Sequence, residues 1–304
     1  MYPTLSHLTE NLFEFKIGFP IQTFTFFIVI AFIIGAYLLA RELKRKEKQG
    51  LMYLVFNRFG DAVQPHQQVR NIIVIAAITG LIGAKLLSIL LNYNQFTIEP
   101  LAYILSVDKF AFYGGLILGT ISVIYYAKKV YLKIIHLLDA AAPALMLSYS
   151  IGRLGGHLSG NGSWGTINLA DKPIIIKFLP DCVWACNYPH NMINKGVLLD
   201  NCFQKYCYVL QYPVFPTSFY EFLICVLLFV LLWRMKRKLV IAGSLFVYYL
   251  FFLAIERLFI EQIKEGTRYN ISGILLTQPE IVSYLLILFC FTLFYLARRN
   301  KLNW

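Results

Sequence analysis

The sequence predicts an all-α integral membrane protein with seven transmembrane helices. Of its 304 residues, 58% are hydrophobic and only 14% are charged, whereas ordinary globular domains are about 45–50% apolar and about 25% charged. The mean hydropathy is +0.62, so long parts of the chain are expected never to meet water. Apolar runs of about 17–25 residues cross a bilayer as helices, and the segments of this kind are 20–40, 70–91, 109–127, 134–152, 217–235, 241–263 and 278–297.

The segment 20–40 is expected to be a retained span. A cleaved signal peptide has a positively charged start and a small-residue cleavage site. Here acidic and neutral residues precede the apolar run, and no such cleavage site closes it.

Clusters of Lys and Arg follow the first, third, fifth and seventh spans. Cytoplasmic loops carry an excess of these residues, so the N-terminus is predicted outside and the C-terminus in the cytoplasm. Most of the net charge of +12 is then an orientation signal, with attraction to anionic membrane lipids as an addition. A nucleic-acid-binding protein would gather its cations on one folded face, and no nucleic-acid partner is expected. The four clusters are Arg41, Lys44, Arg45, Lys46 and Lys48; Lys128, Lys129 and Lys133; Arg234, Lys236, Arg237 and Lys238; and Arg298, Arg299 and Lys301.

The whole chain, 1–304, is predicted to form one membrane domain, with an extracytoplasmic cap inserted at 153–216. No internal repeat or Gly/Ser-rich linker divides it. Four cysteines fall in the cap, where disulfides can form and persist. We expect one or two disulfides, with three possible pairings and a zinc site as the alternative. These four are Cys182, Cys186, Cys202 and Cys207, whereas Cys225 and Cys290 lie in spans and are expected to pack as small apolar residues.

Ionisable residues within or at the ends of spans are candidates for function, because they usually face the interior of the bundle or a wet cavity. Arg257 and Glu261 share one helix face, and Lys264 follows one turn later. Either this is an interfacial salt bridge, or Arg257 holds an anion while Glu261 orients its guanidinium group. The set comprises Lys85, Asp139, Arg153, Glu221, Glu256, Arg257, Glu261 and Lys264.

The segment SIGRLGGHLSGNGSWG, residues 150–165, contains six glycines. Glycine costs about 1 kcal/mol in a helix interior relative to Ala, so a long helix is not expected here. Backbone N–H groups could cradle an anion beside Arg153, or the segment could be a plain helix exit. A Walker A loop is excluded because no Gly-Lys-Ser/Thr follows.

A second glycine-bearing segment, AFYGGLILG at 111–119, falls in the third span. Gly115 and Gly119 predict close helix packing, and Tyr113 needs a polar partner unless it belongs to an interfacial belt. His157 is either a catalytic base or structural, and His190 is expected to order the cap. Neither a Gly-x-Ser-x-Gly elbow nor an HExxH motif is present.

Taken in order along the chain, several of these segments resemble motifs of the bacterial prolipoprotein diacylglyceryl transferase family, particularly its Bacteroidetes form. GRLGGHLSGNGSWG is similar to the family's signature, and PVFPTSFYE at 213–221 to its HPTxLYE element. AFYGGLILG is similar to the family's HGGL or YGGL element, and ERLFIEQIKE at 256–265 to its Arg-x-x-x-Glu helix. The cap segments DCVWACNYPHN and NCFQKYCYVL resemble the insertion of the Bacteroidetes members.

The resemblance implies transfer of an sn-1,2-diacylglyceryl group from phosphatidylglycerol to the lipobox cysteine of a prolipoprotein signal peptide. It implies no cofactor and no metal, and a multi-pass protein of the bacterial inner membrane whose site lies near the periplasmic leaflet. Membrane lipids and lipobox-bearing prolipoproteins are the expected partners. The alternatives are a lipid-binding paralogue without chemistry and a membrane transporter, although the repeated halves typical of transporters are not visible.

Carried over residue by residue, the resemblance assigns Arg153 and Arg257 to the headgroup and phosphate, and Glu261 and Glu221 to catalysis. The thiolate is the attacking species, and candidates for the base are Tyr113, Glu221, His157 or no protein group. The sequence departs from the family pattern at four positions, where Tyr113 and Phe215 replace histidines, Gly156 an asparagine and Phe24 a tyrosine. The other expected substrate-binding residues are Gly156, His157, Gly160, Asn161, Gly165 and Tyr220.

Overall fold

The structure is a computed structural model that describes residues 1–15, 21–56, 60–106, 110–200, 202, 205–239, 241–264, 266–271 and 274–298. Arg299 and Lys301 of the last basic cluster lie outside the described residues. So do Pro20, Lys109 and Glu265, which end predicted segments.

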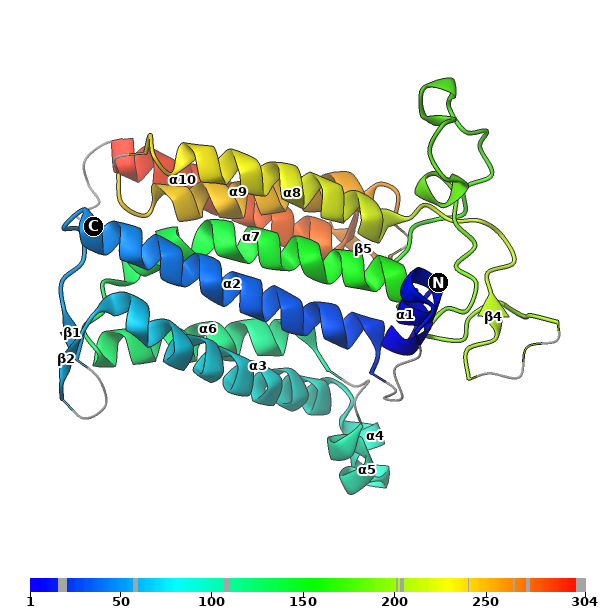
Figure 1. Ribbon diagram of the computed structural model, residues 1–304, viewed down its shortest axis with the longest axis horizontal. Coiled ribbons are helices and arrows are strands. Elements are labelled where there is room, and N and C mark those ends of the chain that lie inside the picture. Colours follow the sequence, from blue (N-terminus) through cyan, green and yellow to red (C-terminus); the bar gives the residue numbers. More distant parts are fainter. Residues whose placement is uncertain are drawn as a thin grey trace. The chain divides into compact units, whose positions relative to one another are not determined.

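Each of the seven predicted spans contains a long helix (Figure 1). Five of them are long and apolar enough to cross a membrane, namely α2, α3 with the turn before it, α7, α8 and α10. α9 contains Glu256, Arg257 and Glu261, and α6 ends in two lysines. The chain is thus a mostly helical membrane protein. The long helices are α2 (Thr23–Lys48), α3 (Val69–Leu91), α6 (Phe112–Lys129), α7 (Ile134–Ser159), α8 (Thr217–Met235), α9 (Ser244–Glu261) and α10 (Gln278–Arg298).

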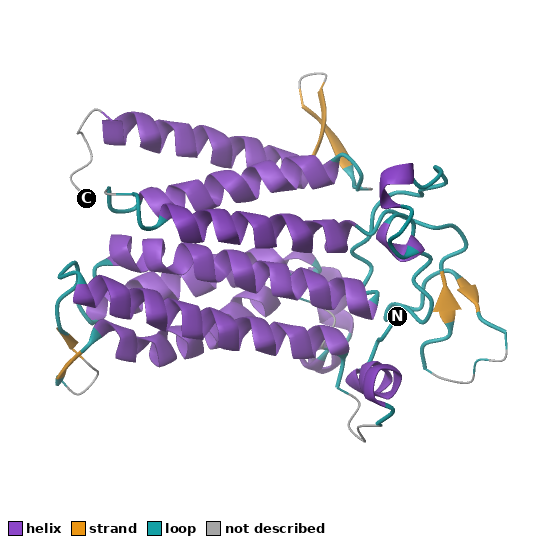
Figure 2. Cartoon of the chain, turned by 45° about the horizontal axis from the view of Figure 1, so that its top comes forward, coloured by secondary structure: helices purple, strands orange, loops and turns teal. Residues whose placement is uncertain are grey.

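Three short antiparallel hairpins correct the all-α prediction in detail (Figure 2). In the last of them Arg268 pairs with Thr277, so the chain leaves the end of α9, turns back and enters α10. The strands are β1 (Val55–Phe56), β2 (Ala62–Val63), β3 (Val197–Leu198), β4 (Tyr208–Val209), β5 (Arg268–Ile271) and β6 (Ile274–Thr277). The short helices are α1 (Leu5–Phe13), η1 (Pro65–Gln68), α4 (Tyr93–Ile98), α5 (Pro100–Leu105), η2 (Ile174–Ile176) and η3 (Asp181–Val183).

The chain divides into two compact units, and each is described by itself. Unit 1 comprises residues 1–35 and 142–304, and in it α9 packs against both α8 and α10 (Figure 2). Its core centres on Ala142, Met146, Cys225, Leu232 and Leu245. The prediction that Cys225 packs as an apolar residue is confirmed.

Unit 2 comprises residues 36–141, and its main contact joins α3 to α6. A Cβ placed on Gly83 would lie 2.6 Å from Cβ of Leu118. A Cβ placed on Gly115 would lie 2.9 Å from the carbonyl oxygen of Gly80. Glycines therefore let these two helices approach closely, as predicted for Gly115.

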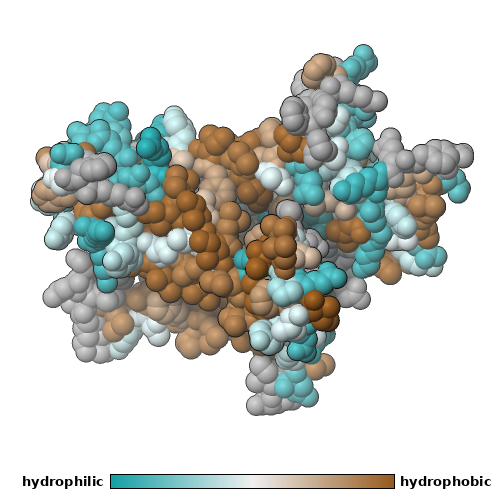
Figure 3. Space-filling view, turned by 90° about the horizontal axis from the view of Figure 1, so that it is seen from below, coloured by the Kyte–Doolittle hydropathy of each residue, from teal (hydrophilic) through white to brown (hydrophobic). Residues whose placement is uncertain are grey.

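Large apolar side chains cover the outside of the helices. Leu90 on α3, Leu227 on α8 and Leu288 on α10 are 73%, 70% and 62% exposed. The face shown in Figure 3 has apolar side chains gathered over the helical part and hydrophilic ones toward its margins. Exposed apolar surface on this scale is unfavourable in water, and it suits contact with lipid.

Two helices are longer than predicted. α2 continues to Lys48, because its basic last turns suit a helix end in water, and Nε of Arg45 contacts Glu42 at 2.9 Å. α7 continues to Ser159 through three glycines, so the expectation that the glycines end this helix is wrong. A Cβ on Gly155 would lie within 3.0 Å of the Phe27 ring of α2, and this close packing offsets the cost of glycine.

The cap is cross-linked by two disulfides, Cys182–Cys186 and Cys202–Cys207. This confirms the predicted disulfides, selects one of the three pairings and rules out the zinc alternative for these four residues. Asn191 is fully buried, and its side-chain amide donates to the carbonyl oxygen of Lys195 at 2.9 Å. Burial raises the pKa of the Tyr188 phenol, which lies in the apolar core of the cap.

Candidate functional site

A cluster of charged side chains is built from α7, α8 and the end of α9 in unit 1. Glu221 is fully buried near the start of α8. Its Oε2 lies 2.8 Å from Nε of Arg153 on α7, and its Oε1 lies 3.3 Å from Nη1 of Arg257 on α9. Nζ of Lys264 lies 3.4 Å from the same Oε1. One buried carboxylate thus contacts three cations from separate parts of the chain.

Tyr149 supplies an aromatic surface beside both arginines. It lies one helical turn before Arg153, whose Nε donates a hydrogen bond to the Tyr149 hydroxyl at 2.9 Å. The guanidinium carbons of Arg153 and Arg257 lie 4.9 and 5.3 Å from the centre of the Tyr149 ring, within the range of cation–π contacts. Because the N–H of Arg153 points to Tyr149, Oε2 of Glu221 makes an ion pair but no hydrogen bond.

The exposed side of this cluster is positive. The Arg153, Arg257 and Lys264 side chains are 19%, 24% and 20% exposed, whereas Glu221 is 0% exposed. Burial lowers the pKa of Lys264, Glu221 opposes this effect, and the two arginines add to it. A small anion can therefore reach the cations without meeting Glu221.

The glycine-rich segment ties the three parts of the cluster together. The Thr217 and Ser218 hydroxyls at the start of α8 donate to the carbonyl oxygen of Ser163 at 3.0 and 2.6 Å. The Thr166 N–H donates to the carbonyl oxygen of Ile263 at 2.9 Å, just after α9. These bonds fix the distances between the helix ends, and so the separation of the charged groups.

The backbone cradle expected beside Arg153 is not formed. Arg153 lies within α7, and the N–H groups after the helix already donate to protein oxygens. These N–H groups belong to Gly160, Asn161, Ser163, Gly165 and Thr166, with the acceptors His157, Gly156, Asn161, Phe215 and Ile263 in that order. An anion at this place would be held by side chains.

The predicted glycines and Asn161 have structural contacts. Gly160 has a φ of +63°, which favours glycine. A Cβ on Gly165 would lie 2.8 Å from Cγ2 of Thr217, where the segment passes the start of α8. Gly156 lies against Asn161, whose side-chain oxygen accepts the Ser163 N–H at 3.2 Å. These residues shape the segment around Arg153.

His157 and Tyr220 contact the cap. Nδ1 of His157 lies 3.0 Å from the Tyr188 hydroxyl, and the His157 ring packs on Phe219. The Tyr220 hydroxyl donates to the carbonyl oxygen of Val183 at 2.9 Å. In the described part of the chain no ion pair joins either side chain to the charged cluster.

Two further carboxylates lie on α9. Glu256 is buried, its Oε2 lies 4.0 Å from Nε of Arg257, and neither of its oxygens has a hydrogen-bond partner among the described residues. Glu261 is buried but forms no ion pair with Arg257 in the described part of the chain. The expectation that Glu261 orients the Arg257 guanidinium is therefore wrong, and Glu221 contacts it instead.

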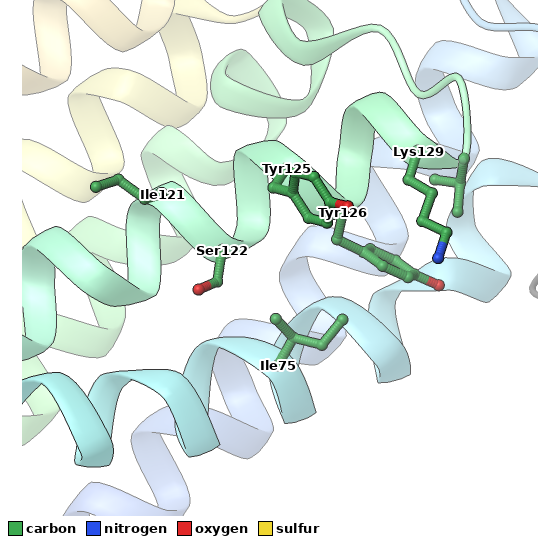
Figure 4. A pocket seen from close by; sticks show the side chains of 7 residues that line it. Ile75, Ile121, Ser122, Tyr125, Tyr126 and Lys129 are labelled. Carbon is green, nitrogen blue, oxygen red and sulfur yellow. The ribbon is translucent and has the colours of Figure 1, made fainter.

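Tyr113 belongs to unit 2 and is described there. It lies near the start of α6, and its ring packs edge-on against Phe112 at 5.8 Å. A pocket of about 430 Å³ lies nearer the other end of α6, lined by Ser122, Tyr126 and Lys129 among others (Figure 4). None of the predicted site residues lines that pocket.

A comparison with protein families decides what kind of protein carries this cluster. The model described as "Prolipoprotein diacylglyceryl transferase" matches residues 12–296. The chain belongs to the prolipoprotein diacylglyceryl transferase family. A phosphatidylglycerol--prolipoprotein diacylglyceryl transferase of Streptococcus equi subsp. zooepidemicus strain H70 is 25% identical over 296 residues, 96% of each chain.

Two other relatives carry the same name as the Streptococcus equi protein. The one from Streptococcus pyogenes serotype M5 is 27% identical over 235 residues, 76% of this chain and 79% of its own. The one from Leptospira interrogans serovar copenhageni is 27% identical over 198 residues, 57% of each chain. The similarity to members of the diacylglyceryl transferase family therefore extends over nearly the whole chain.

Within this diacylglyceryl transferase, Tyr149 is the cluster residue that sequence analysis missed. Its spacing of four residues from Arg153 on one helix was the available signal. A tyrosine in an apolar run is so common that this spacing alone does not separate it from the helix core.

Proposed function

We propose that this chain transfers the sn-1,2-diacylglyceryl group of phosphatidylglycerol to the lipobox cysteine thiol of prolipoproteins. The C–O bond between the diacylglyceryl carbon and the phosphate oxygen breaks, a thioether C–S bond forms, and glycerol 1-phosphate leaves. The observation that carries the proposal is the pair of arginines, Arg153 and Arg257, held by one buried carboxylate in a chain of this family.

The two arginines suit the charge that develops in this reaction. Negative charge builds on the departing phosphate, and donors fixed in advance stabilise it most effectively. Glu221 and Tyr149 fix both guanidinium groups before any substrate arrives. Arg153 and Arg257 are therefore assigned to the phosphate, and Glu221 is assigned to positioning them.

The proton acceptor for the cysteine thiol is to be found among few groups. Tyr113, Glu221 and His157 are the protein candidates, and an acceptor from solvent is the alternative. Nδ1 of His157 is occupied by Tyr188 and Glu221 by three cations, which favours Tyr113 or solvent. A pH–rate profile of Tyr113→Phe decides between these two, because only a phenol that accepts the proton makes the profile depend on this substitution.

We also propose seven spans in the bacterial inner membrane, with the N-terminus outside and the cap 153–216 on the periplasmic side. The alternation of basic clusters supports this orientation, and so do the disulfides of the cap. Asp171→Cys is expected to react with a membrane-impermeant maleimide on spheroplasts, and Lys48→Cys only after permeabilisation. The reverse pattern would contradict the orientation.

The activity is tested with purified protein, phosphatidylglycerol vesicles and a lipobox peptide with a single cysteine. Mass spectrometry is expected to show the peptide heavier by one diacylglyceryl unit, on the cysteine. A peptide with Ser in place of that Cys is the control. An unmodified cysteine peptide after incubation with folded protein would refute the proposed function.

A further inference from the structure

A polar pocket opens beside the charged cluster in unit 1. It has a volume of about 270 Å³ and lies among the end of α9, the β5–β6 hairpin and the start of α10 (Figure 2). Ligand pockets for drug-sized molecules occupy about 300–1,000 Å³. This pocket is therefore of a size for a small polar group.

The Glu261 carboxylate lines this pocket without a partner from the protein. Glu261 is only 6% exposed, and the described part of the chain offers it neither a hydrogen bond nor an ion pair. A Cβ on Gly266 would lie 3.1 Å from Oε1 of Glu261, so the chain passes close to the carboxylate without a donor. Buried polar groups are nearly always hydrogen-bonded, which indicates that the donors come from a ligand.

The pocket is continuous with the arginine cluster. Arg257 and Lys264 both line it and both contact Glu221. A phosphate held by the arginines would therefore direct its smaller substituent toward Glu261. The Gln278 side chain, on the opposite wall, adds a second polar group.

The charges of the pocket favour a neutral headgroup with hydroxyl groups. Hydroxyls donate hydrogen bonds to a carboxylate, and bonds to charged groups are the stronger ones. An ammonium headgroup would also suit Glu261, but it would approach Lys264 and Arg257 at close range. A headgroup with a carboxylate would face Glu261 itself.

We propose that this pocket is a headgroup subsite in which Glu261 binds the two free hydroxyls of the phosphatidylglycerol headgroup, while Lys264 excludes cationic headgroups. The proposal rests on the proposed function, since it names where the headgroup of that substrate lies. It assigns Glu261 to recognition of the substrate, and it leaves the phosphate to Arg153 and Arg257.

The substrate panel that tests it consists of phosphatidylglycerol, phosphatidylpropanol, which lacks both hydroxyls, and phosphatidylethanolamine, each in vesicles with the lipobox peptide. For the wild-type protein we expect kcat/KM to fall about 10- to 100-fold from phosphatidylglycerol to phosphatidylpropanol, because Glu261 is left unpaired. Equal use of these two lipids would overturn the subsite. Transfer from none of the three would instead refute the proposed function.

Two variants assign the selectivity to residues. Glu261→Gln is expected to reduce the preference for phosphatidylglycerol over phosphatidylpropanol to less than about threefold, and Lys264→Gln to raise the relative use of phosphatidylethanolamine. Asp181→Asn, a carboxylate with 95% side-chain exposure in the cap, is the matched control and should keep the wild-type preferences. Equal losses with all three lipids in Glu261→Gln would overturn the assignment. If that variant has no measurable activity, the wild-type panel and Lys264→Gln decide.

Discussion

Buried ion pairs occur in both units, and they differ in charge balance and access. In unit 2, Lys46 on α2 faces Asp139 on α7 at 3.5 Å, and the two side chains are 8% and 7% exposed. In unit 1, Glu221 faces three cations whose side chains are 19–24% exposed. Including Glu256, the contacts of this cluster join three cations to two carboxylates.

The difference between the two places is informative about function. A closed pair with equal charges neutralises itself and can be replaced by apolar residues at little cost. A cluster with one surplus cation and partly exposed guanidinium groups is incomplete until an anion binds. A phosphodiester, with a single negative charge, supplies the missing charge.

The largest expected effect is the loss of either arginine from unit 1. Arg153→Ala or Arg257→Ala should lower the rate of diacylglyceryl transfer by about 10²–10³-fold, the cost of removing one preorganised donor to a developing anion. Peptide mass spectrometry measures the rate, and size-exclusion chromatography in detergent checks folding. Near wild-type rates in either folded variant would remove the phosphate-binding role.

Removing the shared carboxylate should have the next largest effect. Glu221→Gln keeps the shape but releases both guanidinium groups, and a misplacement of about 1 Å costs up to about 10²-fold in rate. Transfer is expected to fall about 10- to 100-fold, with kcat more affected than KM. Unchanged kcat would mean that Tyr149 alone positions the arginines, and Tyr149→Phe is the companion variant.

The pair of unit 2 should affect stability instead of transfer. Lys46→Met leaves Asp139 buried opposite an apolar side chain, which costs about 3–5 kcal/mol of unfolding free energy. The double variant Lys46→Met/Asp139→Leu should recover most of this loss. Denaturation in mixed micelles measures both, and transfer per folded molecule should stay within about twofold. A large loss of transfer in the folded double variant would place the pair in the functional machinery.

The smallest expected effect is at the second carboxylate of unit 1. The Glu256 oxygens make no hydrogen bond in the described part of the chain, and its contact with Arg257 is long, at 4.0 Å. Glu256→Gln should change the transfer rate by less than about threefold, since a long ion pair contributes about 0–1 kcal/mol. A loss as large as that of Glu221→Gln would show that both carboxylates position Arg257.

Helix positions could be predicted closely where a single strong signal fixed both ends. α8 begins at Thr217 and ends at Met235, as predicted from the apolar run between a proline and a basic cluster. α7 could not be predicted in this way, because its glycines pack against Phe27, which is more than a hundred residues away in sequence. Local propensity gave the wrong end there because a tertiary contact outweighed it.

For the site, sequence alone singled out Arg153, Glu221, Arg257 and Lys264, because ionisable groups are costly in apolar runs and few are present. It also determined the membrane class and the motifs that agree with the family. Only the tertiary structure decided the partners: Glu221 and not Glu261 contacts Arg257, and Tyr149 lies beside both arginines. The physical reason is distance. Helical spacing predicts neighbours within about four residues, whereas Arg153, Glu221 and Arg257 meet only when three helices and the glycine-rich segment pack together.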